Sequence, residues 1–209
     1  MNGHYKQAIR DAIYLPSYYA YLEHRFGWSP ADISTLNWES FRRILRSFRT
    51  YQATVVKHLH GIAPTGKYAN RYDKHQPASC PACQHVSECN NHLLSCSATS
   101  RKQWRVKFKR RLYALRQGKT ATDPFLWQIL ESGIRRVQQG DVSHIDASQY
   151  PTNYRPLIQQ QNRIGWIQLF RGRWVQQWGN LTNSGVLGKT PVLFTRKASI
   201  GLAQWDAFS

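Results

Sequence analysis

Four cysteines close together in the sequence carry the clearest chemistry of the chain. Cys80, Cys83, Cys89 and Cys96 lie within 17 residues, and clustered cysteines more often bind a metal than form disulfides between distant segments. Cys80 and Cys83 make a C-x2-C turn, which lets two thiolates reach one ion. His92 and Cys96 are four residues apart, so they share one face of a helix. The set of Cys80, Cys83, His92 and Cys96 predicts a tetrahedral Zn2+ site with a structural role, since four protein ligands exclude water from the ion.

The third ligand of this site has an alternative. Cys89 lies three residues before His92 on the same helical stripe, so Cys89 in place of His92 would give an all-cysteine site. His85 is a spare donor, and reduced cysteines packed in a core without metal are the other interpretation. Because the 80–96 segment has few apolar side chains, we expect a bound ion to contribute on the order of 10 kcal/mol to its folding.

The elements that position the site are predicted to be helices. The expected fold class is mainly α, a helical bundle with an inserted loop-rich zinc-binding module. We divide the chain into an N-terminal helical region with a basic helix at 38–60 (1–61), the loop and zinc module (62–97), a basic helical region (98–179) and a tail (180–209). The closing residues AQWDAFS resemble the opening of a further helix, so a truncated tail in a fragment or relic is one interpretation.

Local signals place the individual helices. Apolar periodicity predicts helices over 38–60, 98–117 and 154–179, and a helix over 4–25 that is broken at Pro16. Ser29 followed by Pro30 predicts a helix start, as does Asp123 followed by Pro124, and Gly140 predicts the end of the second of these helices. Residues 62–79 and 141–153 read as loops, and Gly165 and Gly172 as points of close packing between helices.

The charge of the chain indicates its partner. Twenty-nine Lys and Arg face 11 Asp and Glu among 209 residues, which gives a formal net charge of +18. A nucleic acid would relieve the resulting self-repulsion, and we expect RNA or DNA as the partner. The sequence has no apolar run of the length that crosses a bilayer and no secretory signal pattern. We therefore expect an intracellular protein, in the nucleus or the cytoplasm, with no membrane partner and no small-molecule substrate.

Three basic stripes are candidate nucleic-acid contacts. Residues 101–116 contain eight cations and no acid. If Trp104, Phe108, Leu112 and Leu115 lie in the core, the cations face outward. They are Arg101, Lys102, Arg105, Lys107, Lys109, Arg110, Arg111 and Arg116. The second stripe is Arg42, Arg43, Arg46 and Arg49, and the third is Arg155, Arg163, Arg171 and Arg173. A solvated helix face is the alternative for each stripe. Tyr68 and Tyr72, beside Lys67 and Arg71, are candidates for stacking on bases.

The sequence resembles the zinc-binding region that follows the polymerase domain in reverse transcriptases of non-LTR retrotransposons. The resemblance rests on HLHGIAPTGKYANRY at 58–72, then Cys80, Cys83, the HLLSC ending at 92–96 and Trp104. LNWESFRRIL at 36–45 and IGWIQLFRGRWVQQW at 164–178 are similar to flanking segments of such proteins. The resemblance implies zinc binding, contact with the RNA of the element or with its DNA target, and a reverse-transcriptase polypeptide as a further partner.

The chain departs from such proteins in two ways. It contains no Tyr/Phe-x-Asp-Asp polymerase signature, and none of its 11 acidic residues is adjacent to another, so a two-metal carboxylate site has little material. The family's loop between the two ligand pairs is often acidic, whereas this loop carries only Glu88. We therefore expect a module without catalytic activity and not a polymerase.

Three functions compete at this point. The first is a zinc-stabilised module that binds RNA or single-stranded DNA without catalysis. The second is a protein-interaction scaffold of a retroelement protein, in which the charge is incidental. The third is a zinc-dependent nuclease that would use side chains near the end of the 38–60 helix and in the following loop, namely His58, His60, Asp73 or His75.

Overall fold

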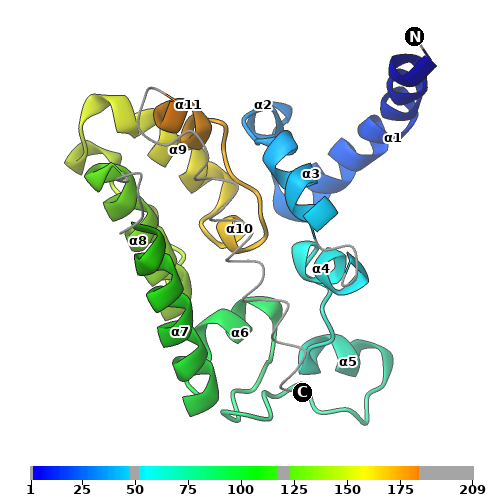
Figure 1. Ribbon diagram of the computed structural model, residues 1–209. Coiled ribbons are helices and arrows are strands. Elements are labelled where there is room, and N and C mark those ends of the chain that lie inside the picture. The colour runs from blue at the N-terminus through cyan, green and yellow to red at the C-terminus, as the bar shows by residue number, and fades with distance from the viewer. Residues whose placement is uncertain (1, 48–51, 117–122, 184–209) are drawn as a thin grey trace. The chain divides into compact units, whose positions relative to one another are not determined.

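The mainly-α prediction is confirmed. The computed structural model describes residues 2–47, 52–116 and 123–183, and these are mostly helical, with no strand among them (Figure 1). The chain divides into two units, Met1–Leu36 and Asn37–Ser209. Of the helices within the described ranges, none combines the length and the apolar character needed to cross a membrane.

The first unit contains two helices. α1 (Asn2–Phe26) passes through Pro16, so the predicted break is wrong. A proline inside a helix removes one backbone hydrogen bond, and here the helical residues on both sides outweigh that loss. α2 (Pro30–Ser34) begins as predicted, because the Ser29 side chain accepts from the N–H of Asp32 while the Asp32 carboxylate accepts from the N–H of Ser29.

The second unit starts with α3 (Trp38–Ser47) and α4 (Gln52–Leu59), which fall within the predicted helix over 38–60. Residues 48–51, with Arg49, lie outside the described residues. Phe41 and Leu59 are buried against each other, with Trp38 and Leu45 packed beside them.

Helix α5 (Gly66–Tyr72) lies inside the predicted loop over 62–79, so that prediction is wrong in part. α5 buries none of its residues, and the side chain of its N-cap, Thr65, makes no capping hydrogen bond. The carboxylate of Glu88, 22 residues further along the chain, accepts from the N–H of Gly66 instead. Local sequence signals cannot reveal a contact between residues so far apart. α6 (Asn90–Ser95) follows the loop that contains Cys80 and Cys83, and Cys89 is its N-cap.

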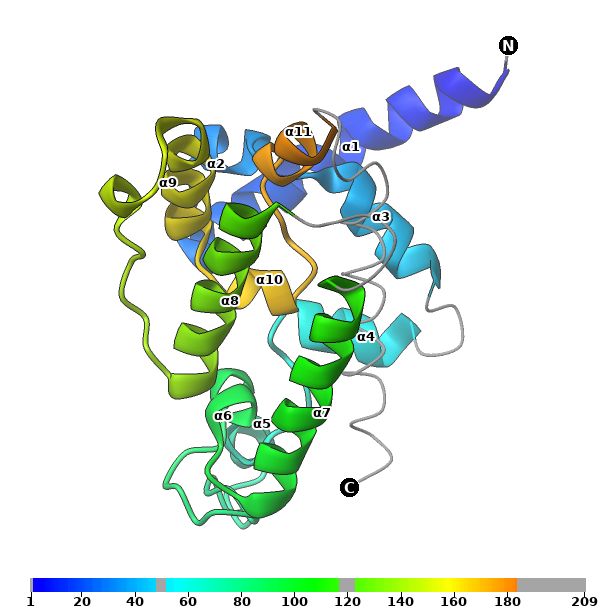
Figure 2. The same cartoon turned by 60° about the vertical axis from the view of Figure 1, so that its left-hand side comes forward.

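Helices α7 (Thr99–Arg116) and α8 (Pro124–Gln139) match their predictions closely. The Asp123 side chain accepts from the N–H of Leu126, and Gly140 ends α8 in the left-handed conformation, with φ of 73°. The two helices lie side by side (Figure 2), because the Tyr113 hydroxyl donates to Glu131 at 2.6 Å and its ring contacts Trp127.

The single helix predicted over 154–179 is wrong. The chain forms three helices there, α9 (Arg155–Ile164), α10 (Ile167–Phe170) and α11 (Gln177–Asn183). Gly165 and Gly172 have φ of 94° and 70°, values that end a right-handed helix and that glycine tolerates best. The predicted 141–153 loop also contains the short 3-10 helix η2 (Ala147–Gln149) and meets η3 (Thr152–Tyr154).

The core of the second unit gathers around α8 and α9. Gly133 of α8 lies against the ring of Trp166, so closely that a Cβ at this position would overlap the ring. Phe108 of α7 and Phe170 of α10 pack at 5.6 Å between ring centroids. The buried apolar side chains of α8 and α9 include Leu126, Ile129, Leu130, Ile134, Leu157 and Ile158. The ring contact of Phe108 with Phe170 thus packs α7 against α10.

Candidate metal centre

Four potential metal ligands meet beside α6. The ligand atoms of Cys80, Cys83, His92 and Cys96 all lie within 4.8 Å of one another. Cys80 Sγ is 3.9 Å from Cys96 Sγ, and Cys83 Sγ is 3.2 Å from His92 Nε2. Ligands that bind an ion at about 2.0–2.3 Å in a tetrahedron lie about 3.5–3.8 Å apart. The cluster therefore fits one four-coordinate metal ion.

The local fold explains why these side chains converge. The backbone carbonyl of Cys80 accepts from the N–H of Gln84 at 2.8 Å, and the N–H of Cys80 donates to the carbonyl of His85 at 2.8 Å. These two bonds close a tight turn around the C-x2-C pair. Gln84 has a positive φ of 60° within this turn. His92 lies in α6 and Cys96 is its C-terminal cap, so the helix presents both toward the turn.

Cys89 has a different place. It is the N-cap of α6, and its sulfur accepts from the backbone N–H of His92 at 3.4 Å. It does not belong to the group of four, which is the only group of three or more potential metal ligands in the parts of the chain that the structure describes. The geometry therefore favours His92 over Cys89 as the third ligand.

The pKa shifts of the donors act on metal binding in opposite directions, since that of Cys80 opposes it and those of Cys83 and His92 favour it. Burial raises the pKa of the Cys80 thiol to about 11, so the metal-free side chain holds its proton and releases it when an ion binds. A backbone hydrogen bond from His85 lowers the pKa of Cys83. Burial, and then the neighbouring His85, lower the pKa of His92, which favours the neutral imidazole that binds metals.

Glu88 joins this centre to α5. Its buried carboxylate accepts from the backbone N–H of Gly66 at 2.8 Å, and its carbonyl accepts from the N–H of Lys67 at 3.0 Å. Sequence reasoning missed this role. One signal was present, because Glu88 is the only acidic residue between positions 74 and 122 of a strongly basic chain.

Arg105 joins the centre to α7. Its Nη1 donates to the backbone carbonyl of Leu94 in α6 at 3.2 Å. Leu94 is buried, and Arg105 is half-buried and does not face outward as predicted. Burial lowers the pKa of Arg105, while the nearby Cys96 raises it. Arg105 thus bonds α7 to α6, and Glu88, in the loop just before α6, bonds α5 (Figure 1).

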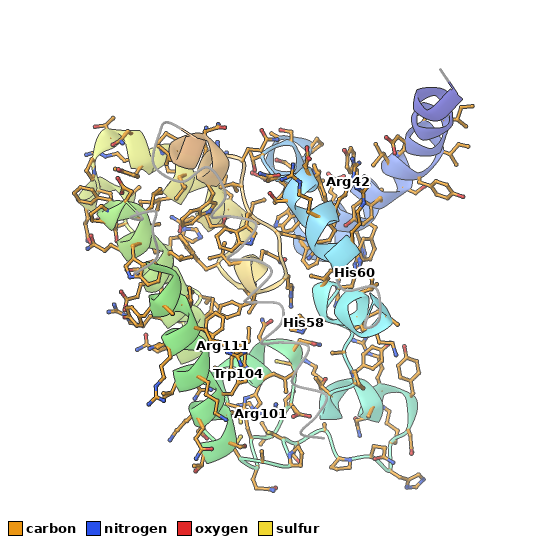
Figure 3. The ribbon with its side chains drawn as sticks, viewed as in Figure 1. Arg42, His58, His60, Arg101, Trp104 and Arg111 are labelled. Atoms are coloured by element: carbon orange, nitrogen blue, oxygen red, sulfur yellow. The ribbon has the colours of Figure 1, made fainter. Side chains whose placement is uncertain are left out.

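The other cations of α7 lie largely on its surface. Figure 3 shows Arg101, Trp104 and Arg111 spaced along the helix. Trp104 is half-buried and stacks on Phe108 at 5.4 Å between ring centroids, which places it at the edge of the core. Arg101 is half-buried, and the exposed cations are Lys102, Lys107, Lys109, Arg110 and Arg111. The side chain of Arg116 lies outside the described side chains.

The second stripe is exposed at its described members, whereas the third is not a continuous surface, because only Arg163 of its four members is exposed. Arg42 and Arg46 are exposed on α3, and Arg43 is paired with Glu39. Arg173 is only 1% exposed, and its guanidinium donates to the carbonyl of Leu59 at 2.8 Å. Arg155 donates to the carbonyl of Tyr150 and Arg171 to Asn91, so these side chains support the fold. The helical period could not reveal where these arginines lie, because the region predicted as one helix forms α9, α10 and α11.

The residues of the nuclease hypothesis do not form a group among the described residues. His58 and His60 lie at the end of α4 (Figure 3), whereas Asp73 and His75 are exposed in the loop after α5. The Nε2 atom of His58 is buried without a hydrogen-bond partner. Burial, and then the nearby charge of Arg171, lower the pKa of His58 to about 4, so its imidazole is neutral.

Comparison of the chain with family models, with curated proteins and with solved structures found no match. The function of the chain is therefore inferred from the geometry of the candidate metal centre and from the charges around it.

Proposed function

We propose that the chain is a zinc-stabilised module that binds RNA or single-stranded DNA without catalysis. The observation that carries the proposal is the hydrogen bond from Arg105 to the Leu94 carbonyl, because it fixes a helix rich in cations to the metal-centred segment. Three sulfur donors and one imidazole form a set typical of structural zinc. Four protein ligands leave no open position at the ion, which supports a structural role for the metal.

The charge distribution supports a nucleic-acid partner. α7 carries no acidic residue, and five of its cations are exposed: Lys102, Lys107, Lys109, Arg110 and Arg111. Cations at successive turns of a helix match the repeated charges of a phosphate backbone. Arg42 and Arg46 on α3, and Lys67 and Arg71 on α5, extend the exposed charge. The proposal agrees with the resemblance to the zinc-binding region of non-LTR retrotransposon reverse transcriptases, in which this chain would be the accessory part.

Salt dependence of binding tests this function. The zinc-loaded chain is titrated against a fluorescein-labelled 20-nucleotide single strand by fluorescence anisotropy, at salt concentrations from 50 to 300 mM. We expect the logarithm of the affinity to fall with the logarithm of the salt concentration at a slope of several units, at about 0.7 for each phosphate contacted on a single strand. A flat salt response would contradict the proposal.

A charge-matched pair of variants locates the binding surface. Lys102→Gln/Lys107→Gln/Lys109→Gln removes three exposed cations of α7, and Arg25→Gln/Lys57→Gln/Arg135→Gln removes three exposed cations elsewhere. We expect the α7 variant to reduce the salt slope by about 2 and the control to change it far less. An equal effect in both variants would indicate unspecific attraction by the net charge.

A protein-interaction scaffold is the second candidate, and exposed apolar side chains on α7 favour it. Val106 is 50% exposed and Tyr113 is 38% exposed. A protein partner that covers α7, such as a reverse-transcriptase polypeptide, would bury both. Co-purification with such a polypeptide that survives nuclease treatment would support the scaffold and not the nucleic-acid module.

A further inference from the structure

Helix α5 carries a surface that the fold itself does not use. Its exposed side is formed by Tyr68, Tyr72, Lys67 and Arg71, which we call the stacking surface. The two rings lie 5.2 Å apart between centroids, and their hydroxyls are 3.2 Å apart. Tyr72 is 74% exposed and Tyr68 half-exposed, although α5 contributes no buried residue to the core. The aromatic area on this helix is therefore not explained by packing.

Charge selects the kind of partner for this surface. Lys67 and Arg71 are exposed beside the two rings, and Lys74 follows α5. The nearest acid in sequence, Asp73, is engaged locally, since its carboxylate accepts from the backbone N–H of His75 at 2.9 Å. Exposed aromatic rings with cations beside them suit unpaired bases, which stack on the rings while their phosphates meet the cations. Duplex bases are already stacked and paired, so a duplex offers this surface only its backbone.

The metal-centred segment holds the stacking surface in place. The Glu88 carboxylate accepts from the Gly66 N–H, and the Glu88 N–H donates to the Ala78 carbonyl at 2.7 Å, so one residue bonds both α5 and the loop that leads to Cys80. Gly66 packs so tightly that a Cβ there would lie 2.8 Å from the Ser79 carbonyl oxygen and 2.9 Å from that of Pro77. These are backbone atoms, which cannot move aside as a side chain can. The surface is thus ordered before any ligand arrives, although α5 is short and exposed.

We propose that Tyr68 and Tyr72 stack on unpaired bases and that Lys67 and Arg71 contact the flanking phosphates, so that the stacking surface makes the module selective for single strands. This inference rests on the proposed function, because it names the part of the nucleic acid that the module reads. It predicts that the two surfaces contribute differently to binding. The stacking surface should strengthen binding to single strands alone, whereas the cations of α7 should strengthen binding to both single strands and duplexes.

The test compares one single strand and one duplex of equal length on the full zinc-loaded chain. Tyr72→Ala and Tyr68→Ala/Tyr72→Ala are the variants, and Tyr14→Ala is the matched control, since Tyr14 is an exposed tyrosine (66%) on α1. We expect Tyr72→Ala to weaken single-strand binding about 5- to 150-fold, by anisotropy, with the affinity for the duplex changed less than twofold. Tyr72→Phe keeps the ring and should restore single-strand binding, and Tyr14→Ala should bind both ligands as the unmodified chain does.

Several outcomes would overturn the inference. Unchanged single-strand binding in the double variant would show that the rings do not stack, and equal losses for the single strand and the duplex would show a merely structural role. Binding of polyglutamate that falls in Tyr72→Ala as much as single-strand binding does would show that the surface recognises charge or a protein and not bases. Failure of the unmodified chain to bind either nucleic acid would overturn the proposed function as well, whereas the first three outcomes leave it standing.

Discussion

Gly66 donates its backbone N–H to the carboxylate of Glu88, 22 residues further along the chain, at 2.8 Å. The bond supplies the N-terminal cap of α5 that the Thr65 side chain does not provide. Its acceptor is a buried side chain of the loop between the two pairs of metal ligands. The order of α5 and the order of the metal centre are therefore linked through one side chain.

Replacement of Glu88 should loosen both parts. Glu88→Ala leaves the N–H of Gly66 without its acceptor, at an expected cost of about 1–3 kcal/mol in unfolding free energy, whereas Glu88→Gln keeps an amide oxygen and should lose less. Urea unfolding measures the free energy, and the rate of zinc transfer to a chelator measures the metal centre. Glu39→Gln, at an exposed pair with Arg43, is the control and should leave the stability essentially unchanged. Equal stability of Glu88→Ala and Glu39→Gln would refute the link.

Gly133→Ala should destabilise the second unit. The added Cβ would overlap the ring of Trp166, whose indole N–H donates to Asn162 at 2.8 Å and so holds the ring in place. Overpacking of this kind costs typically about 1–3 kcal/mol. Thermal unfolding measures the loss, and Ser132→Ala, at the preceding half-buried position, serves as the control. A melting temperature of Gly133→Ala equal to that of the control would mean that α8 and Trp166 do not pack as described.

Arg105 and Lys109 should separate stability from binding. Arg105→Gln removes the charged donor to the Leu94 carbonyl and should lower the unfolding free energy by about 1 kcal/mol, because the bond is partly exposed. Lys109→Gln removes an exposed cation, so its stability should stay within about 0.5 kcal/mol while its salt slope for single strands falls by about 0.7. Urea unfolding and anisotropy on the same samples test both effects. Equal changes in unfolding free energy and in salt slope for the two variants would contradict the separate roles.

His58 predicts how stability depends on pH. Burial lowers its pKa in the folded chain to about 4, from an ordinary value of 6.5, so the unfolded chain binds more protons between these values. The contribution of His58 to stability is therefore complete above pH 6.5 and is lost as the pH falls toward 4, at up to about 1.4 kcal/mol per pH unit. Between pH 7 and pH 5, the unfolding free energy measured in urea should fall less for His58→Gln than for the unmodified chain. His144→Gln, at an exposed histidine, is the control and should lose as much stability as the unmodified chain does. An equally large loss of stability in His58→Gln would refute the prediction.

The parts of the structure that sequence reasoning predicted are those that local signals determine. The C-x2-C turn and the spacing of His92 and Cys96 define a group of potential metal ligands within one short segment, and the Asp123 cap and Gly140 define both ends of α8. A cap or a stop that acts within four residues is visible in the sequence.

The parts that sequence reasoning missed depend on contacts between distant residues. α5 exists because Glu88 caps it, and Arg173 is buried because Leu59, 114 residues away, offers its carbonyl. Gly165 was expected to mark close packing, but its backbone conformation ends α9. Apolar periodicity continued past this glycine, so the pattern predicted one helix where the chain turns.

Metal content tests the central claim most directly. Native mass spectrometry of the purified full chain, with Cys80→Ser and Cys89→Ser prepared alongside, counts the bound ions. We predict one zinc per chain, lost in Cys80→Ser and retained in Cys89→Ser, because Cys80 belongs to the group of four and Cys89 caps α6. A chain that is free of metal and nevertheless fully folded by circular dichroism would contradict the account.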